Sequence, residues 1–129
     1  MTSRLGIESR VKFFGEIMDN SLLAPIFNSC VCCIFPGPSG LAIVHSLAFG
    51  LPVIAAQRAD HGPEIAAVRD EITGRFFRAG DEHDLADKLI ELVTAPETLR
   101  RMSLEARESM RRDYSIEGMV RSFEKACLS

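Results

Sequence analysis

The stretch FPGPSGLAIVHSLAFGLPVI, residues 35–54, joins two apolar runs through a loop rich in proline and glycine. The run that leads into it, VCCIF, is unbroken and apolar, which is typical of a parallel strand covered on both faces. After the loop, Leu41, Val44 and Ala48 predict a helix, and Gly50 predicts its end as a C′ glycine. The run PVIAA then predicts another strand. This order of strand, loop, helix and strand indicates an α/β fold.

Local signals on either side of this stretch extend the same pattern. Strands are expected in VKFF, which Gly15 closes, and in TGRFF. A helix is expected after the capping residue Asp19, and a short one in GPEIAAV with Pro63 in its first turn. Together these elements predict a Rossmann-like parallel sheet with flanking helices, in a single domain of residues 1–129.

The last third of the chain predicts three helices. Asp81 is a candidate cap for the first, Pro96 opens the second, and Ser115 is a candidate cap for the third. Their apolar stripes are, in order, Leu85, Leu89, Ile90 and Val93; Leu99, Met102, Ala106 and Met110; and Ile116, Met119, Val120, Phe123 and Cys127. Helical spacing on one face predicts that each stripe packs inward, and we expect the methionines to serve the core.

Composition indicates a folded, mildly acidic protein. The chain has 129 residues, 47% of them hydrophobic, with 15 basic and 18 acidic residues and a net charge of −3. No basic stripe with interleaved aromatic residues occurs, which argues against nucleic acid as a partner. No signal peptide or apolar stretch of membrane-spanning length is visible, so we expect a cytoplasmic protein with no transmembrane segment.

The cysteines do not predict a disulfide framework or a metal site. Three of the four lie in CVCCIF, at Cys30, Cys32 and Cys33, and the fourth, Cys127, is nearly terminal. No paired CxxC spacing occurs, and the three histidines are scattered. We therefore expect buried, small apolar side chains in a reducing compartment, with no metal and no cofactor.

The loop after VCCIF has the chemistry of an anion site. Gly37 and Gly40 allow the backbone to approach a ligand and to adopt positive φ. The following helix begins with unpaired N–H groups and the positive end of its dipole. These features suit a phosphate. The loop is also compatible with an ordinary tight turn, because it lacks both Gly-Lys-Ser/Thr and GxGxxG.

Two further positions have a functional and a structural interpretation. His45, on the helix after the loop, is either a hydrogen-bond partner for a ligand or a partly buried histidine satisfied by the backbone. At the next crossover, HGPE repeats the arrangement of a glycine before a helix start. There Arg58 is a candidate to bind an anion. The negative charge of Glu64 is a candidate to stabilise the N-terminus of the helix.

Several segments in a fixed order carry a more specific signal than any of these features alone. They are VKFFGEI, LAPIFNSCVCCIFPGPSGLAIVHSLAFGLPVIAA, GPEI, ITGRFF and AGDEHDLADKLIEL. This series resembles the C-terminal, donor-binding domain of GT-B glycosyltransferases of family 4, the group 1 transferases, over nearly the whole chain. The resemblance implies a donor substrate that is a nucleotide-diphosphate sugar, with neither a cofactor nor a metal required.

The same resemblance implies the site residues. The family carries a Glu-x7-Glu motif, whose first Glu contacts the donor sugar and whose second holds the ribose, while the backbone between them faces the diphosphate. Here Gly37 and His45 stand at the two Glu positions. The implied donor site is Gly37 on the side of the sugar, Pro38, Ser39, Gly40 and Leu41 at the diphosphate, and His45 at the ribose. No catalytic residue is assigned.

The resemblance covers only the latter part of the donor-binding domain, so the acceptor domain of the family is expected to be absent. An exposed sheet edge and uncovered apolar surface would follow, and with them self-association through the sheet edge or a swapped helix. The expected function is the donor-binding region of a transferase that acts in surface polysaccharide synthesis, and the isolated chain is not expected to turn over alone. The alternative is a non-catalytic binding or assembly module that retained the fold. A sugar-nucleotide epimerase half is disfavoured because the matching region lacks acidic groups.

Overall fold

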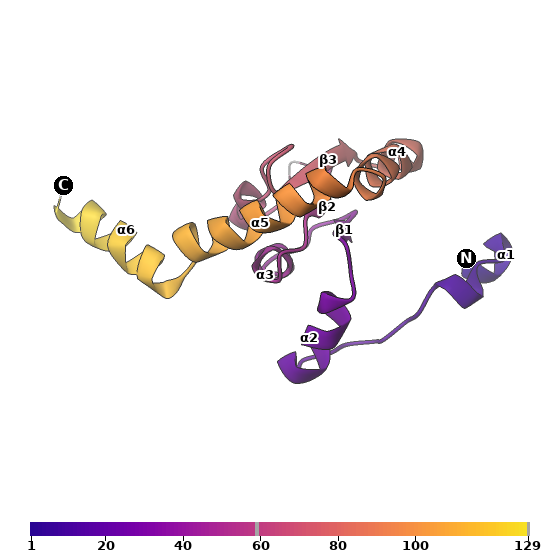
Figure 1. Cartoon of the computed structure of the whole chain (residues 1–129), viewed down its shortest axis with the longest axis horizontal. Helices are drawn as coiled ribbons and strands as arrows, with labels where there is room; N and C mark the ends of the chain where they lie inside the picture. Colours follow the sequence, from indigo (N-terminus) through magenta and orange to yellow (C-terminus); the bar gives the residue numbers. More distant parts are fainter. Residues whose placement is uncertain (59, 129) are drawn as a thin grey trace.

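A three-stranded parallel sheet forms the centre of the structure (Figure 1). The computed structural model describes residues 1–58 and 60–128. The strands are β1 (Cys33–Phe35), β2 (Val53–Gln57) and β3 (Gly74–Arg78), in the order β1-β2-β3. Both pairings are parallel, with Cys33 opposite Val53 and Val53 opposite Gly74. The expected parallel sheet with flanking helices is confirmed.

The middle strand is buried on both faces. Val53 and Ala55 belong to one apolar cluster, Ile54 and Ala56 belong to the other, and all four are 0% exposed. This explains why PVIAA has no polar alternation, because both sides of a central parallel strand face helices. Gly74 of β3 lies so close to the carbonyl of Val53 that a Cβ there would collide with it.

Helices cover the two faces separately. On one face lie α3 (Ala42–Ala48) and the short 3₁₀ helix η2 (Pro63–Ala67), which supply Ile43, Leu47 and Ala67 to the first cluster. On the other lies α4 (Glu82–Val93), which supplies Leu92. The long helix α5 (Pro96–Asp113) spans both clusters, because Met102 packs in the second and Ala106 and Met110 in the first.

The predicted helix starts and ends are confirmed at the residues that carry local signals. Asp19 accepts a hydrogen bond from the N–H of Ser21 at the start of α2 (Asn20–Asn28), and Asp81 accepts one from the N–H of Asp84 at the start of α4. The hydroxyl of Ser115 accepts from the N–H of Gly118 at the start of α6 (Ile116–Leu128). Gly50, just beyond α3, has a φ of +75°, as a C′ glycine requires.

Two of the predicted strands differ from the structure. VKFF forms no strand: after α1 (Thr2–Leu5) and the 3₁₀ helix η1 (Glu8–Arg10) the chain runs without regular structure up to α2. No described strand lies beside this segment to accept its backbone hydrogen bonds, and β propensity alone does not make a sheet. VCCIF contributes only β1, and Ile34 at its centre is 38% exposed, because β1 pairs with β2 alone.

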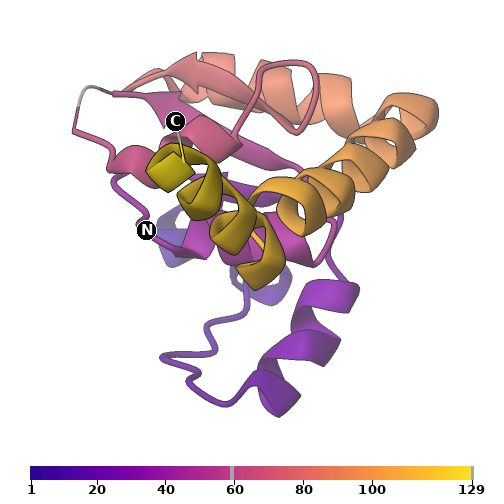
Figure 2. The ribbon, with the colours of Figure 1, turned by 90° about the vertical axis from the view of Figure 1, so that its left-hand side faces the viewer.

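The inward packing predicted for two apolar stripes is wrong in part. On α4, Leu85 and Leu89 pack against the second cluster, whereas Ile90 and Val93 are exposed and Leu92 is buried instead. The face of α4 that lies against the sheet therefore includes Leu92 in place of Ile90 and Val93. On α6 the entire predicted stripe is exposed, because α6 extends from the end of α5 away from the sheet (Figure 1). In Figure 2, which looks from the side of the C-terminus, α6 lies nearest the viewer, in front of the sheet.

The expectation of buried cysteines is also corrected. Cys30 and Cys127 are exposed, and only Cys32 and Cys33 are half-buried. Burial raises the pKa of the Cys32 thiol to about 11 and raises that of Cys33 as well, which disfavours the thiolate form of both. All four cysteines are free. Within the described part of the chain, no helix combines the length and apolar character needed to cross a bilayer.

Candidate functional site

The loop between β1 and α3 lies at the carboxyl end of the sheet and is built from backbone rather than charged side chains. The strand ends at Phe35, and the helix begins at Ala42. Gly40 has a φ of +56°, a backbone conformation that residues other than glycine rarely adopt. The Ser39 carbonyl accepts a hydrogen bond from the N–H of Ala42, and the Gly40 carbonyl accepts one from the N–H of Ile43, both at 3.4 Å. The loop therefore continues directly into the first turn of α3.

The loop's own amides are available to a ligand. In residues 1–58 and 60–128, no hydrogen-bond acceptor is found for the N–H groups of Gly37, Ser39, Gly40 and Leu41. The Ser39 hydroxyl is buried and likewise has no partner within the described chain. Because unpaired amides and hydroxyls near the surface need an acceptor from solvent or from a ligand, this loop offers a row of donors.

The side chains of the loop leave space around these donors. An ideal Cβ at Gly37 would meet no atom within 4 Å. Pro38 is exposed, Ser39 is half-buried, and Leu41 is 77% exposed. Leu41 also lines an apolar cavity of about 360 Å³ with Val44, Pro63, Glu64, Tyr114 and Met119. The structure therefore brings the end of the loop next to η2 and to the junction of α5 and α6.

His45 follows the loop by one helical turn. Its N–H donates to the carbonyl of Leu41 at 3.0 Å. Its ring packs edge-on against Phe27, with centroids 5.8 Å apart, and at a tilt against Phe49, at 5.5 Å. No hydrogen bond to either ring nitrogen occurs within the described residues. The two phenylalanines hold the ring, and both also line a cavity on the side away from the loop. These contacts do not test whether His45 binds a ligand, so its role stays a prediction.

The second crossover, after β2, pairs its charged side chains internally, although His61 Nδ1 is buried without a partner among the described residues. The guanidinium of Arg58 donates two hydrogen bonds to the carboxylate of Asp60, both at 2.7 Å. This pair holds the pKa of Asp60 down, at about 2. His61 Nε2 lies 2.8 Å from the carbonyl of Ala56, and the carboxylate of Glu64 lies over Gly62. Arg58, a predicted anion contact, is already neutralised by its neighbour.

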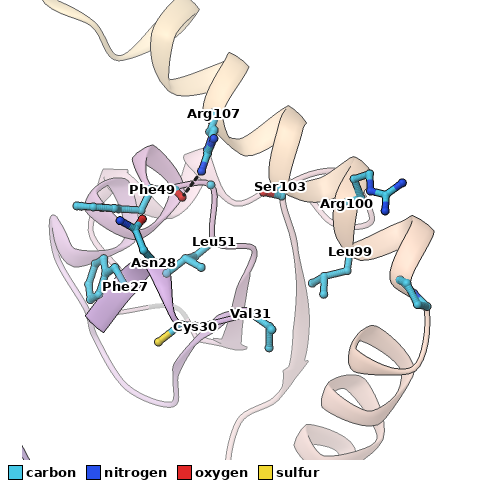
Figure 3. A pocket seen from close by; sticks show the side chains of 12 residues that line it. Phe27, Asn28, Cys30, Val31, Phe49, Leu51, Leu99, Arg100, Ser103 and Arg107 are labelled. Carbon is cyan, nitrogen blue, oxygen red and sulfur yellow. Dashed lines mark hydrogen bonds between the residues drawn. The ribbon is translucent and has the colours of Figure 1, made fainter. Parts of the chain in front are cut away.

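A cavity of about 340 Å³ lies at the opposite end of the sheet (Figure 3). Val31 and Leu51, which line it, precede β1 and β2, whereas the predicted donor loop follows β1. Arg107 of α5 reaches into it and donates to the carbonyl of Phe49 at 3.3 Å. Arg100, Ser103 and Arg107 share one face of α5, and their helical spacing is visible in the sequence.

The described residues contain no group of three or more His, Cys, Asp or Glu side chains placed to hold a metal ion. The chemistry that the donor loop offers is therefore hydrogen bonding from backbone amides and one hydroxyl. Such donors suit an anion with several acceptor oxygens. His45 adds a ring that can donate or accept one hydrogen bond.

Comparison with known proteins places this geometry in a family. Residues 1–95 match the family model described as glycosyl transferases group 1. The chain is 31% identical to a D-inositol 3-phosphate glycosyltransferase of Nocardia farcinica, covering 98% of this chain and 28% of that protein. It is 29% identical to an N-acetyl-alpha-D-glucosaminyl L-malate synthase of Bacillus anthracis, covering 96% of this chain and 32% of the relative.

Solved structures show the same fold. A sucrose-phosphate synthase from Thermosynechococcus elongatus superposes with a TM-score of 0.81 at 25% identity, over 97% of this chain and 31% of its own. Anabaena HepE in complex with UDP superposes with a TM-score of 0.78 at 22% identity, over 98% of this chain and 34% of the HepE chain. The chain thus spans about a third of the length of the relatives that it matches. The fold is that of part of a GT-B donor-binding domain, and the chain belongs to the group 1 glycosyltransferases.

Proposed function

We propose that this chain is the donor-binding part of a glycosyltransferase and holds a nucleotide-diphosphate sugar on the loop between β1 and α3. The observation that carries the proposal is the set of four loop N–H groups, at Gly37, Ser39, Gly40 and Leu41, that lack acceptors within the described chain. They lie at the carboxyl end of a parallel strand, where α/β sheets bind ligands. Family membership supplies the substrate class.

The diphosphate would be held by amides rather than by side-chain charge. Each phosphate oxygen accepts readily from a backbone N–H, and the buried Ser39 hydroxyl adds a donor on the same loop. The dipole of α3 contributes less than expected from the sequence, because the helix has only seven residues. We therefore assign the anion to the loop amides and not to the helix end.

The ribose would lie against His45. The ring is fixed by its contacts with Phe27 and Phe49, so it offers a hydrogen bond without losing much side-chain freedom. The predicted sugar side, at Gly37, has open space and no side chain. We expect the nucleotide part of the donor to contribute more binding free energy than the sugar.

Transfer itself would depend on groups beyond those assigned here. Catalysis by positioning and by stabilising the leaving diphosphate needs donors on the phosphates and an acceptor held in line with the sugar. The loop can supply the first. The named transferases that this chain matches are about three times as long, so we expect residues 1–129 by themselves to bind the donor without measurable transfer. A cytoplasmic location and a role in surface polysaccharide synthesis stay predictions.

A non-catalytic assembly module is the second candidate. The observation in its favour is that neither Gly37 nor His45 is the carboxylate that the resemblance implies at these positions. The two candidates predict different behaviour toward nucleotides. A donor site binds a nucleoside diphosphate, whereas an assembly module has no reason to retain that affinity.

Isothermal titration calorimetry of the full chain with UDP, GDP, UDP-glucose and GDP-mannose separates them. Saturable binding of one diphosphate, with similar affinity for its sugar conjugate, supports the donor site. The corresponding nucleoside without phosphates serves as the matched control and is expected to bind far more weakly, since it lacks the group that the loop amides hold. Absence of binding by all four nucleotides would exclude the donor site and leave the assembly module.

A further inference from the structure

Three aromatic rings from α2 and the end of α3 form a closed cluster. The Phe27 ring lies edge-on to the Phe49 ring, with centroids 5.0 Å apart and planes at 80°, and to the His45 imidazole, at 5.8 Å and 63°. The His45 and Phe49 rings are 5.5 Å apart at a tilt of 49°. Each ring therefore contacts both of the others, and all three are half-buried. They form a group separate from the two described clusters that flank the sheet.

The cluster restricts the orientation of the imidazole. His45 and Phe49 are four residues apart along α3, so their side chains share one face of that helix, and Phe27 of α2 contacts both. Edge-on aromatic contacts are directional, because the edge of one ring is electropositive and the face of the other is electronegative. A histidine side chain has several staggered rotamers. The cluster favours those rotamers of His45 that keep both ring contacts.

A third helix holds Phe49 in place. Arg107 of α5 donates a hydrogen bond to the carbonyl of Phe49 at 3.3 Å (Figure 3). The next residue is Gly50, where a Cβ would collide with the guanidinium of Arg107, so this approach of α5 to the end of α3 requires glycine. Side chains from α2, α3 and α5 therefore converge on the support of one imidazole.

We propose that Phe27 and Phe49 are positioning residues for nucleotide binding, and that Phe27 links the affinity of the site to the placement of α2. This assignment rests on the proposed function, in which the ribose lies against His45. The two phenylalanines line the cavity on the side away from the donor loop, so they act through His45 (Figure 3). They raise the fraction of molecules that hold the imidazole in the binding rotamer, and the apparent dissociation constant is inversely proportional to that fraction.

The expected effect has an upper bound. A positioning residue cannot contribute more than the group that it positions, and removal of the His45 ring corresponds to a roughly fivefold loss of affinity. We therefore expect Phe27→Leu and Phe49→Leu each to raise the dissociation constant about two- to threefold. Leucine keeps an apolar side chain at each position and removes the ring. Phe27→Tyr keeps the ring and should bind like the native chain, since Phe27 borders a cavity of about 340 Å³.

A double-mutant cycle in the full chain tests the assignment. Calorimetry with UDP and GDP gives the affinity of the native chain, of Phe27→Leu, of His45→Ala and of the two combined. Phe27→Leu should weaken binding when His45 is present and change nothing when it is absent. The imidazole C–H chemical shifts of His45 should move in Phe27→Leu toward those of the exposed His83, and should stay in place in Phe27→Tyr. Phe123→Leu, at a ring that is 72% exposed on α6, is the matched control and should alter neither measurement.

The possible failures are distinguishable. Absence of UDP and GDP binding by the native chain overturns the proposed function and this assignment together. Native binding that Phe27→Leu and Phe49→Leu leave unchanged overturns this assignment alone. The same holds if Phe27→Leu causes an equal loss with and without His45, because a general loss of stability has that effect and positioning does not.

Discussion

The two loops that leave the carboxyl ends of β1 and β2 differ in the side chains that they carry. The loop after β1 contains no charged side chain, and the N–H groups of Gly37, Ser39, Gly40 and Leu41 have no acceptor among the described residues. The loop after β2 closes on itself through the Arg58–Asp60 pair and the contact of His61 with Ala56. The two loops therefore differ in their charged side chains. The loop after β1 has none, whereas in the loop after β2 Arg58 is paired with Asp60. Polar groups without a partner among the described residues occur in both, because His61 Nδ1 is buried and unpaired as the Ser39 hydroxyl is.

The largest expected effect comes from the backbone of the open loop. Gly40→Val places a β-branched residue at a φ of +56°, which costs about 1–2 kcal/mol or more in that conformation and displaces the neighbouring amides. We expect the affinity for the bound nucleoside diphosphate to fall about tenfold or more. Calorimetry measures the affinity, and circular dichroism confirms the fold.

Gly80→Val is the matched control for this substitution. Gly80 has a φ of +77° and, like Gly40, has no atom within 4 Å of an ideal Cβ, so the local strain is comparable. It lies between β3 and α4, away from the donor loop. Equal loss of nucleotide affinity in both variants would mean that general destabilisation, not the loop amides, accounts for the effect.

A smaller effect is expected at His45. His45→Ala removes one hydrogen bond to the ribose, which corresponds to about 1 kcal/mol, or roughly a fivefold loss of affinity. The nucleotide-induced thermal shift should shrink accordingly. His83→Ala, at an exposed histidine of α4, is the control and should leave the shift as it is. An unchanged shift in His45→Ala would remove His45 from the site.

The smallest effect on nucleotide binding is expected in the closed loop. Arg58→Ala should change the affinity less than twofold, because the guanidinium is occupied by Asp60. A large loss would show instead that Arg58 leaves Asp60 to bind the ligand, and the contrast between the two loops would fail.

The same substitution has a clear signature in the titration of Asp60. The hydrogen bonds from Arg58 lower the pKa of Asp60 from 3.8 to about 2, so the pair stabilises the loop above pH 4 and loses its effect as the pH falls toward 2. Carboxyl ¹³C chemical shifts should report a midpoint near 2 in the native chain and one near 3.8 in Arg58→Ala. Identical midpoints would contradict the assigned pairing.

Features with a local cause could be predicted from the sequence. Asp19, Asp81 and Ser115 cap helices because a side-chain oxygen accepts from an N–H two or three residues later, and the neighbours of each residue are enough to predict that. The strands of PVIAA and TGRFF, and the positive φ of Gly50, follow in the same way. The family, with its fold, was also within reach, because several segments in a fixed order carry more information than any one of them.

Features that depend on a distant partner were missed. VKFF has strand propensity but no described strand beside it, and Ile34 is exposed because β1 has one neighbouring strand instead of two. The α6 stripe has the same helical spacing as the stripe of α5, yet α5 lies against the sheet and α6 does not. The donor-site residues stay predictions, since the open amides are compatible with a ligand without identifying it.

The amino-acid sequence by itself determined where the capped helices begin, where the strands of PVIAA and TGRFF lie, and to which family the chain belongs, because caps, turns and unbroken apolar runs act over a few residues. Only the tertiary structure decided which apolar stripes are covered, which strand is central, and that Arg58 is neutralised by Asp60. Burial and hydrogen-bond satisfaction are properties of what lies opposite a residue in space, and the spacing of residues along the chain does not contain that information.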